Sequence, residues 1–284
     1  MKWTDDRSDN FDDRRGSGGG GGMLVGGGLG TIIIAAIVFF LGGDPSAILN
    51  SNASGSQQTE QRQLSQEELK IGEFVNMLQA LNEETWAKIF NDNNIKFRPA
   101  KVVLFESGTQ SGCGAARSEM GPFYCPNDET IYMDMSFFSE LQSKFGAKVG
   151  QFTVAYVLGH EYGHHIQNLL GTLGKIDQLR QSGRYSESEM NRVSVANELQ
   201  ADFYAGVWAK QTDSREKILE PGDIQEAMSA AAAVGDDNIQ KRAQGYVNQE
   251  SFTHGSSAQR EEWFMKGYNT GDIRQGDTFD ALLK

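Results

Sequence analysis

The longest apolar stretch of the chain is the charge-free run MLVGGGLGTIIIAAIVFFLGG, which covers the 21 residues 23–43. A helix of that length spans roughly 30 Å at about 1.5 Å per residue, which matches the hydrocarbon core of a bilayer. A buried core helix is the alternative, but such helices usually keep a polar face. The pattern therefore predicts one N-terminal transmembrane helix over residues 23–43.

Polar segments flank this run on both sides. Residues 1–22 are charged and end in a glycine run, and residues 44–63 are polar. Neither segment carries enough apolar surface to offset its ordering entropy, so we expect a disordered tail and a linker. Four cations precede the run, and none follows it before Arg62. The positive-inside rule then predicts a single-pass protein of the cell membrane, with a cytoplasmic N-terminus and an exported C-terminal domain. A cleaved signal peptide is the alternative, because small residues at 51–53 resemble a cleavage site.

Residues 64–284 read as one domain. Ser65 and Glu68 form a capping box at the start of a helix with an apolar stripe. Two short apolar runs, 102–105 and 130–133, are the best strand candidates, and nearly everything after residue 136 has helical periodicity. We therefore predict an α+β fold, with a short sheet beside a mostly helical body. The strand at 130–134 is either an edge strand that pairs with substrate backbone or an ordinary core strand.

Charge and cysteine content narrow the functional classes. The formal net charge of −12 argues against binding to nucleic acid, which requires clustered cations. The two cysteines, Cys113 and Cys125, exclude a four-cysteine zinc site. Export favours a disulfide between them, which would close a 13-residue loop and contribute roughly 3 kcal/mol. Two free thiols are the alternative.

The sequence His160-Glu161-Tyr162-Gly163-His164 is an H-E-x-x-H motif. Histidines four residues apart lie on one helix face and can bind one metal ion, while Glu161 points beside the ion and can take a proton from a bound water. A pair of surface histidines on an amphipathic helix is the alternative. The apolar lead-in at 152–158 argues against it, because unsatisfied imidazoles are costly to bury.

A catalytic zinc site usually has a third protein ligand. The metzincin spacing would place a histidine at position 170, where this chain has Leu170, and His165 lies about 100° round the helix from His164. Glu198 is the best carboxylate, because Asp202 follows it by one turn and can accept the free ring N–H of a ligand histidine. An acidic, solvent-facing pair is the alternative.

Three segments resemble the bacterial neutral zinc metallopeptidases: residues 160–167, residues 197–202, and residues 253–260. The N-terminal segment, which is rich in Arg and Gly and precedes one apolar run, also resembles that family. The resemblance implies a zincin-like domain of gluzincin type, in which His160, His164 and Glu198 bind Zn²⁺.

A looser resemblance links the chain to CAAX-processing and heat-shock type membrane zinc proteases. Their late H-P-x-x-x-x-R element corresponds here to His254-Gly255 followed by Arg260. It implies that His254 donates a hydrogen bond to the tetrahedral intermediate and that Arg260 braces the site. A surface histidine at a helix start is the alternative reading of His254.

Together these observations predict a membrane-anchored zinc metallopeptidase that hydrolyses peptide bonds in a protein or peptide substrate. The zinc would lie between the helices near 150–170 and 187–211, with Glu161 activating its bound water. Two alternatives remain: a zinc hydrolase of another amide, such as one in the cell wall, and a catalytically silent zinc-binding interaction module.

Overall fold

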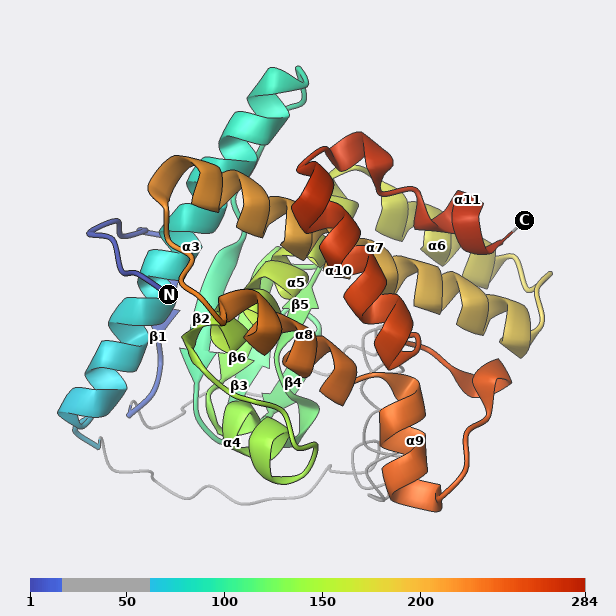
Figure 1. Ribbon diagram of the computed structural model, residues 1–284, viewed down its shortest axis with the longest axis horizontal. Coiled ribbons are helices and arrows are strands. Elements are labelled where there is room, and N and C mark those ends of the chain that lie inside the picture. Colours follow the sequence, from blue (N-terminus) through green and yellow to red (C-terminus); the bar gives the residue numbers. More distant parts are fainter. Residues whose placement is uncertain (17–61, 284) are drawn as a thin grey trace.

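A four-stranded sheet and a layered set of helices make up the described chain, as the computed structural model in Figure 1 shows. The structure describes residues 1–16 and 62–283. The strands of the main sheet follow the order β1 (Phe11–Asp13), β2 (Lys101–Phe105), β6 (Thr130–Asp134), β5 (Phe123–Cys125). A separate hairpin is formed by β3 (Gly108–Ser111) and β4 (Gly114–Arg117). The helices are α3 (Gln66–Asp92), α4 (Ser136–Ser143), α5 (Gln151–Leu169), α6 (Thr172–Gln181), α7 (Glu187–Glu216), α8 (Asp223–Ala233), α9 (Asp236–Gln244), α10 (Ser257–Thr270) and α11 (Thr278–Leu282). The predicted α+β class is confirmed for these residues.

The centre of the sheet consists of the two strands that the sequence predicts. β2 and β6 run parallel, and all five residues of β6 are buried. β6 is therefore a core strand and not an edge strand, because β2 and β5 pair with its two sides. The edge next to the helices is β5, which is antiparallel to β6 and contacts α5. Its three residues are too few to show a strand pattern in the sequence.

The prediction of a disordered tail is wrong for residues 1–16. β1 pairs with β2 in parallel, and its flanks continue the pairing: Val102 N donates to Asn10 O at 2.8 Å, and Arg14 N donates to Leu104 O at 2.8 Å. The buried Arg15 guanidinium forms an ion pair with Asp13 at 2.7 Å and donates to the Glu68 carbonyl. The charged composition of this segment wrongly predicts disorder, because Arg15 and Asp13 are paired within the fold and not solvated by water.

The predicted transmembrane helix at 23–43 lies outside the described residues, as does nearly all of the 44–63 linker. None of the helices in the described ranges is long and apolar enough to cross a bilayer. The two residues that border the undescribed segment are in contact: Arg62 N donates a hydrogen bond to Gly16 O at 3.0 Å. Residues 1–16 are thus packed against the domain that follows residue 62.

The helices lie in successive layers over the sheet. α5 contacts β5 and β6, α7 packs on α5, and α10 packs on α7. α7 shows no clear apolar stripe because it is buried on several sides over its central turns. A Cβ at Gly163 would lie 2.8 Å from the Ala201 carbonyl oxygen, so glycine at this position lets α5 and α7 approach closely. This close crossing brings the H-E-x-x-H motif against α7.

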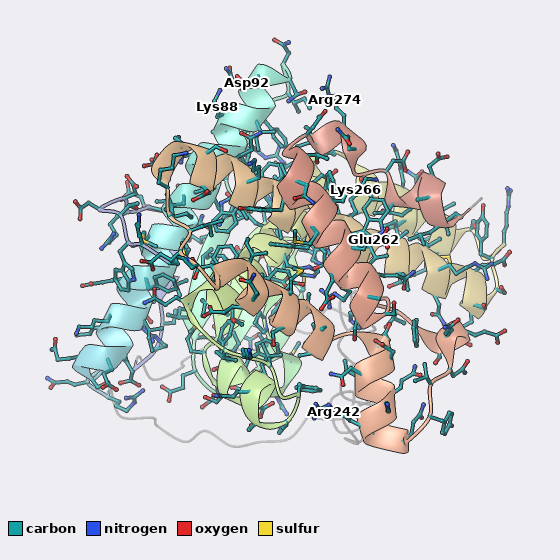
Figure 2. The ribbon with its side chains drawn as sticks, in the orientation of Figure 1. Lys88, Asp92, Arg242, Glu262, Lys266 and Arg274 are labelled. Atoms are coloured by element: carbon teal, nitrogen blue, oxygen red, sulfur yellow. A yellow bond between two sulfur atoms is a disulfide. The ribbon has the colours of Figure 1, made fainter. Side chains whose placement is uncertain are left out.

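The outer helix faces carry charged side chains, several of which are labelled in Figure 2. Lys88 and Asp92 form an exposed ion pair at 2.7 Å, and the Lys266 ammonium lies 4.1 Å from the centre of the Trp263 ring. Exposed ion pairs of this kind add little to stability, because water screens them. The stability of the domain therefore comes from its interior.

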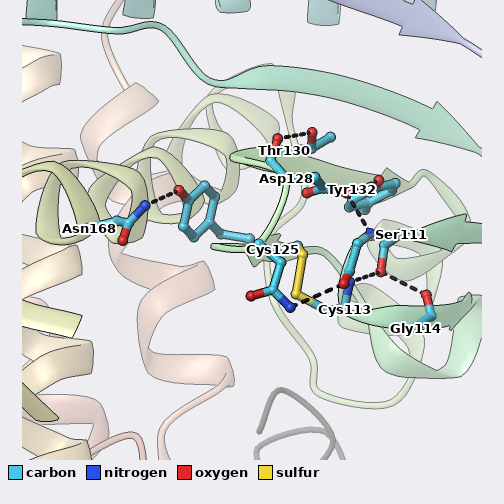
Figure 3. Close-up of a disulfide and its surroundings, with 11 residues drawn as sticks. Ser111, Cys113, Gly114, Cys125, Asp128, Thr130, Tyr132 and Asn168 are labelled. Atoms are coloured by element: carbon cyan, nitrogen blue, oxygen red, sulfur yellow. Dashed lines mark hydrogen bonds between the residues drawn. A yellow bond between two sulfur atoms is a disulfide. The ribbon is translucent and has the colours of Figure 1, made fainter. Parts of the chain in front are cut away.

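The predicted disulfide is present. Cys113, in the turn between β3 and β4, is bonded to Cys125 at the end of β5 (Figure 3). On the other side of the same strand, the Tyr124 hydroxyl accepts a hydrogen bond from Asn168 of α5 at 3.0 Å. The edge strand is therefore held on one side by a covalent bond to the hairpin and on the other by the helix that carries the H-E-x-x-H motif.

Candidate metal centre

Two imidazoles and one carboxylate converge between α5 and α7. The Nε2 atoms of His160 and His164 lie 3.2 and 3.6 Å from the two carboxylate oxygens of Glu198. One potential ligand atom from each residue lies within 4.8 Å of the others. The three side chains are only 9%, 14% and 6% exposed, so the cluster is largely shielded from bulk water. The structure thus brings together the three residues that the sequence predicts as metal ligands.

The other ring nitrogen of each histidine is held by an acceptor. His160 Nδ1 lies 2.8 Å from Asp202 Oδ1, and His164 Nδ1 lies 2.8 Å from Gln167 Oε1. Such contacts orient a ligand ring and leave Nε2 free to bind a metal. The contact of Asp202 with His160 is the one expected from its one-turn spacing to Glu198. Gln167 was not predicted, although its position three residues after His164 on the same helix is a usable signal.

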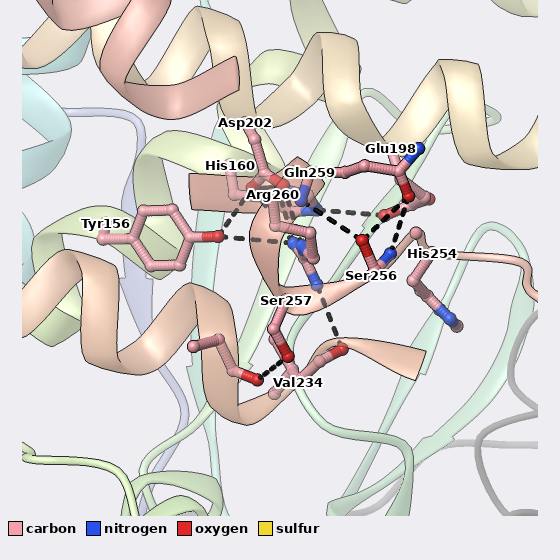
Figure 4. Close-up of polar contacts among 12 residues, drawn as sticks. Tyr156, His160, Glu198, Asp202, Val234, His254, Ser256, Ser257, Gln259 and Arg260 are labelled. Carbon is pink, nitrogen blue, oxygen red and sulfur yellow. Dashed lines mark hydrogen bonds and ion pairs between the residues drawn. The ribbon is translucent and has the colours of Figure 1, made fainter. Parts of the chain in front are cut away.

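Asp202 is the centre of a buried polar network (Figure 4). Arg260 donates to its two oxygens from Nε at 2.7 Å and from Nη2 at 3.0 Å, and the Tyr156 hydroxyl donates at 2.6 Å. Burial opposes the charge of Asp202, but Arg260 and His160 lower the pKa of this carboxyl to about 2. Arg260 therefore keeps ionised the carboxylate that orients His160.

The electrostatics of the centre favour a cation. Burial opposes a charged imidazole, yet the carboxylates of Asp202 and Glu198 raise the pKa of His160 to about 10. Burial also opposes the charge of Glu198, but the two imidazoles hold its pKa well below the usual value. Two histidines and a glutamate with their Nε2 and carboxylate atoms converging are a donor set suited to zinc, with room in its coordination for one further ligand. The residues therefore fit a catalytic zinc ion.

Glu161 lies beside this cluster. Burial raises the pKa of its carboxyl, and the nearby backbone of Tyr124 in the edge strand β5 acts weakly in the opposite direction. The carboxylate thus lies between the ligand helix and the edge strand. A buried carboxylate with a raised pKa is suited to accept and return a proton.

His254 lies in the turn before α10, and its side chain is 12% exposed. Its Nδ1 lies 3.1 Å from Asp236 Oδ1, and Asp236 Oδ2 accepts the backbone N–H groups of Thr253, His254 and Gly255 at 2.6–2.9 Å. Burial opposes a charge on the ring, but Asp236 raises the pKa of His254. The ring is close enough to Glu198 to help lower the pKa of that carboxyl. Asp236 has no recognisable motif, and sequence reasoning missed it.

His165 is turned away from the cluster. Its Nδ1 lies 3.0 Å from the Tyr124 hydroxyl, and its Nε2 lies 2.7 Å from the Arg98 carbonyl oxygen. Burial lowers the pKa of this ring. His165 therefore links α5 to the edge strand, in agreement with its exclusion as a metal ligand.

Comparison with known proteins agrees with this site. The sequence profile of the family described as "Putative neutral zinc metallopeptidase" matches residues 1–279. The chain is 43% identical over 228 residues to the uncharacterized protein YpfJ of Escherichia coli K12, covering 80% of this chain and 78% of that protein. It is 51% identical over 187 residues to the uncharacterized protein Rv2575 of Mycobacterium tuberculosis, covering 63% of this chain and 61% of that protein. No solved structure matches the chain.

Proposed function

Since the chain belongs to that family of neutral zinc metallopeptidases, we propose that it is a zinc-dependent peptidase that hydrolyses peptide bonds. The observation that carries this proposal is the buried convergence of His160, His164 and Glu198, with the carboxylate of Glu161 beside them. A purely structural zinc site would need a fourth protein ligand and no base.

Each protein group has a distinct task in the proposed reaction. Zinc bound by the three ligands would lower the pKa of a water molecule towards 7 and polarise the scissile carbonyl. Glu161 accepts a proton from the attacking water and delivers it to the leaving amine. His254 donates a hydrogen bond to the developing oxyanion, and Asp236 fixes the orientation of its ring. Arg260 acts as a positioning residue through Asp202 and His160.

The edge strand β5 supports a peptide as the substrate. Among the described strands β5 pairs only with β6, and the backbone of Tyr124 lies near Glu161. An extended peptide can add to such an edge through backbone hydrogen bonds. This alignment brings the peptide backbone of a substrate alongside Glu161 and the metal ligands.

We further propose that the domain acts outside the cytoplasm, close to a membrane. The disulfide between Cys113 and Cys125 supports an oxidising compartment, and the apolar run at 23–43 supports attachment to a bilayer. Residues 1–16 then lie on the same side of the membrane as the domain that they pack against.

The test uses the purified full chain loaded with zinc and a mixture of unmodified peptides, with products identified by mass spectrometry. The intact chain should generate new peptide termini. Glu161→Gln should retain one equivalent of zinc and lose cleavage, because an amide cannot accept the proton. Cleavage of cell-wall amides but not of peptides would reassign the chain as another amide hydrolase. Zinc binding with no hydrolysis of either substrate would indicate an interaction module.

A further inference from the structure

A chain of side-chain amides connects the ligand His164 to the C-terminal segment. Gln167 Oε1 lies 2.8 Å from His164 Nδ1, and Gln167 Nε2 lies 3.2 Å from Gln200 Oε1. Gln200 Nε2 donates in turn to the Gly276 carbonyl at 2.7 Å. Both amide side chains are buried. The metal-binding face of α5 is therefore connected through α7 to the residues that precede α11.

The Gly276 carbonyl fixes the donor-to-acceptor direction of these hydrogen bonds. A carbonyl oxygen can only accept, so Gly276 requires Gln200 to present Nε2 to it and Oε1 to Gln167. Gln167 must then present its own Nε2 to Gln200 and its Oε1 to His164. The Asn197 carbonyl, which accepts from Gln167 Nε2 at 2.7 Å, imposes the same orientation independently. An acceptor at Nδ1 requires the proton of His164 to be on that nitrogen, which leaves the Nε2 lone pair for a metal ion.

The two ligand histidines are thus oriented by different means. His160 faces the ionised Asp202, which Arg260 holds within the core. His164 faces the neutral amide of Gln167, which is oriented by the Asn197 carbonyl and, through Gln200, by the Gly276 carbonyl 112 residues after His164. The C-terminal segment is itself fixed on α7, because the buried Thr278 hydroxyl donates to the Ala196 carbonyl at 2.5 Å. At Gly276 a Cβ would lie 2.5 Å from the Phe203 ring, so only glycine allows the backbone to lie this close.

We propose that Gln167 and Gln200 are positioning residues that hold His164 in its metal-binding tautomer, and that zinc affinity therefore depends on the contact of Gln200 with the Gly276 carbonyl. This inference rests on the zinc site of the proposed function. It assigns no contact between either glutamine and a substrate.

Zinc affinity of the full chain, measured by competition with a chromogenic chelator, tests the proposal. Gln167→Met keeps the side-chain length and removes the acceptor, so zinc should bind about 10–100-fold more weakly. Gln200→Met leaves Gln167 with the Asn197 carbonyl as a partner, so we expect about a tenfold loss, at the lower end of that range.

Gln211→Met is the matched control. Gln211 lies on the same helix, and its Nε2 also donates to a carbonyl of the C-terminal segment, that of Gly271, at 2.7 Å. None of its hydrogen bonds in the described chain leads to a metal ligand. Gln211→Met should therefore leave zinc affinity within about twofold of the wild type, well below the loss expected for a residue that supports a ligand. A merely structural effect of loosening the C-terminal segment would weaken zinc binding in the control as well.

Substitution of cobalt for zinc gives a second readout, since its visible absorption reports ligand geometry. The spectrum should change in Gln167→Met and remain that of the wild type in Gln211→Met. Zinc affinities of Gln167→Met and Gln200→Met equal to that of the wild type would overturn the proposal, as would an equal loss in the control. A wild-type chain that binds one zinc but cleaves no peptide would instead refute the proposed function, while the comparison of affinities would still stand.

Discussion

Replacing Arg260 by methionine removes the guanidinium that faces the buried carboxylate of Asp202 while retaining much of the apolar side chain. The Arg260 and Asp202 side chains are 5% and 0% exposed, and two hydrogen bonds of 2.7 and 3.0 Å join them. Breaking a buried pair by removing one partner costs about 3–5 kcal/mol, because the remaining charge, here that of Asp202, loses its main compensation. For a domain of this size, that loss corresponds to a fall in melting temperature of roughly 6–20 °C.

Urea unfolding in the presence of a chelator measures this cost apart from any contribution of zinc. Asp202→Asn and the double variant complete a double-mutant cycle. Because the double variant leaves no unpaired charge, it should be more stable than the sum of the two single effects predicts.

Arg274→Met is the matched control. The Arg274 side chain is 77% exposed, and its ion pair with Asp272 lies on the outer surface (Figure 2). This variant should unfold like the wild type.

Two results would refute the reasoning. One is a loss below about 1 kcal/mol in Arg260→Met, which is the size of effect typical of surface pairs. The other is strict additivity in the cycle, which would mean that Arg260 and Asp202 stabilise the fold independently. In either case the hydrogen bonds drawn in Figure 4 would not be what keeps Asp202 ionised beside His160.

Three further predictions follow from the site and the fold. His254→Ala should retain its zinc while kcat falls about 10²–10³-fold, as for the loss of one oxyanion donor, and an unchanged kcat would remove His254 from the reaction. Replacing both Cys113 and Cys125 by serine should lower the free energy of unfolding by roughly 3 kcal/mol under oxidising conditions and leave it unchanged, relative to the wild type, in reductant. Reporters fused to the two ends of the chain should both report the same compartment, because β1 pairs with β2, and opposite compartments would show that this pairing does not form in the cell.

Much of the site could be predicted from the sequence because its signals are local. The spacing of His160 and His164 places both rings on one face as soon as the segment is helical, and the same holds for Glu198 and Asp202. The capping box at Ser65 marks a helix start through contacts within three residues, and it is present in the structure. The apolar runs of β2 and β6 predict strands because their burial is continuous.

Other features depend on contacts between residues far apart in the chain. β1 is charged and polar, and it becomes a strand only because β2 offers an unpaired edge and Arg15 finds Asp13 and the Glu68 carbonyl. β5 has three residues, so its place as the edge strand beside Glu161 depends on β6, the disulfide and α5.

The metal ligands can be predicted from local sequence, whereas the residues that orient them depend on contacts between distant parts of the chain. A motif of five residues determines which atoms can bind zinc, because one helical turn sets their separation. The nitrogen of His164 that carries the proton is determined by Gln167, which the Asn197 carbonyl and the contact of Gln200 with Gly276 orient. Hydrogen bonds have direction, and that direction is transmitted only through groups that tertiary packing brings into contact, so no local pattern can encode it.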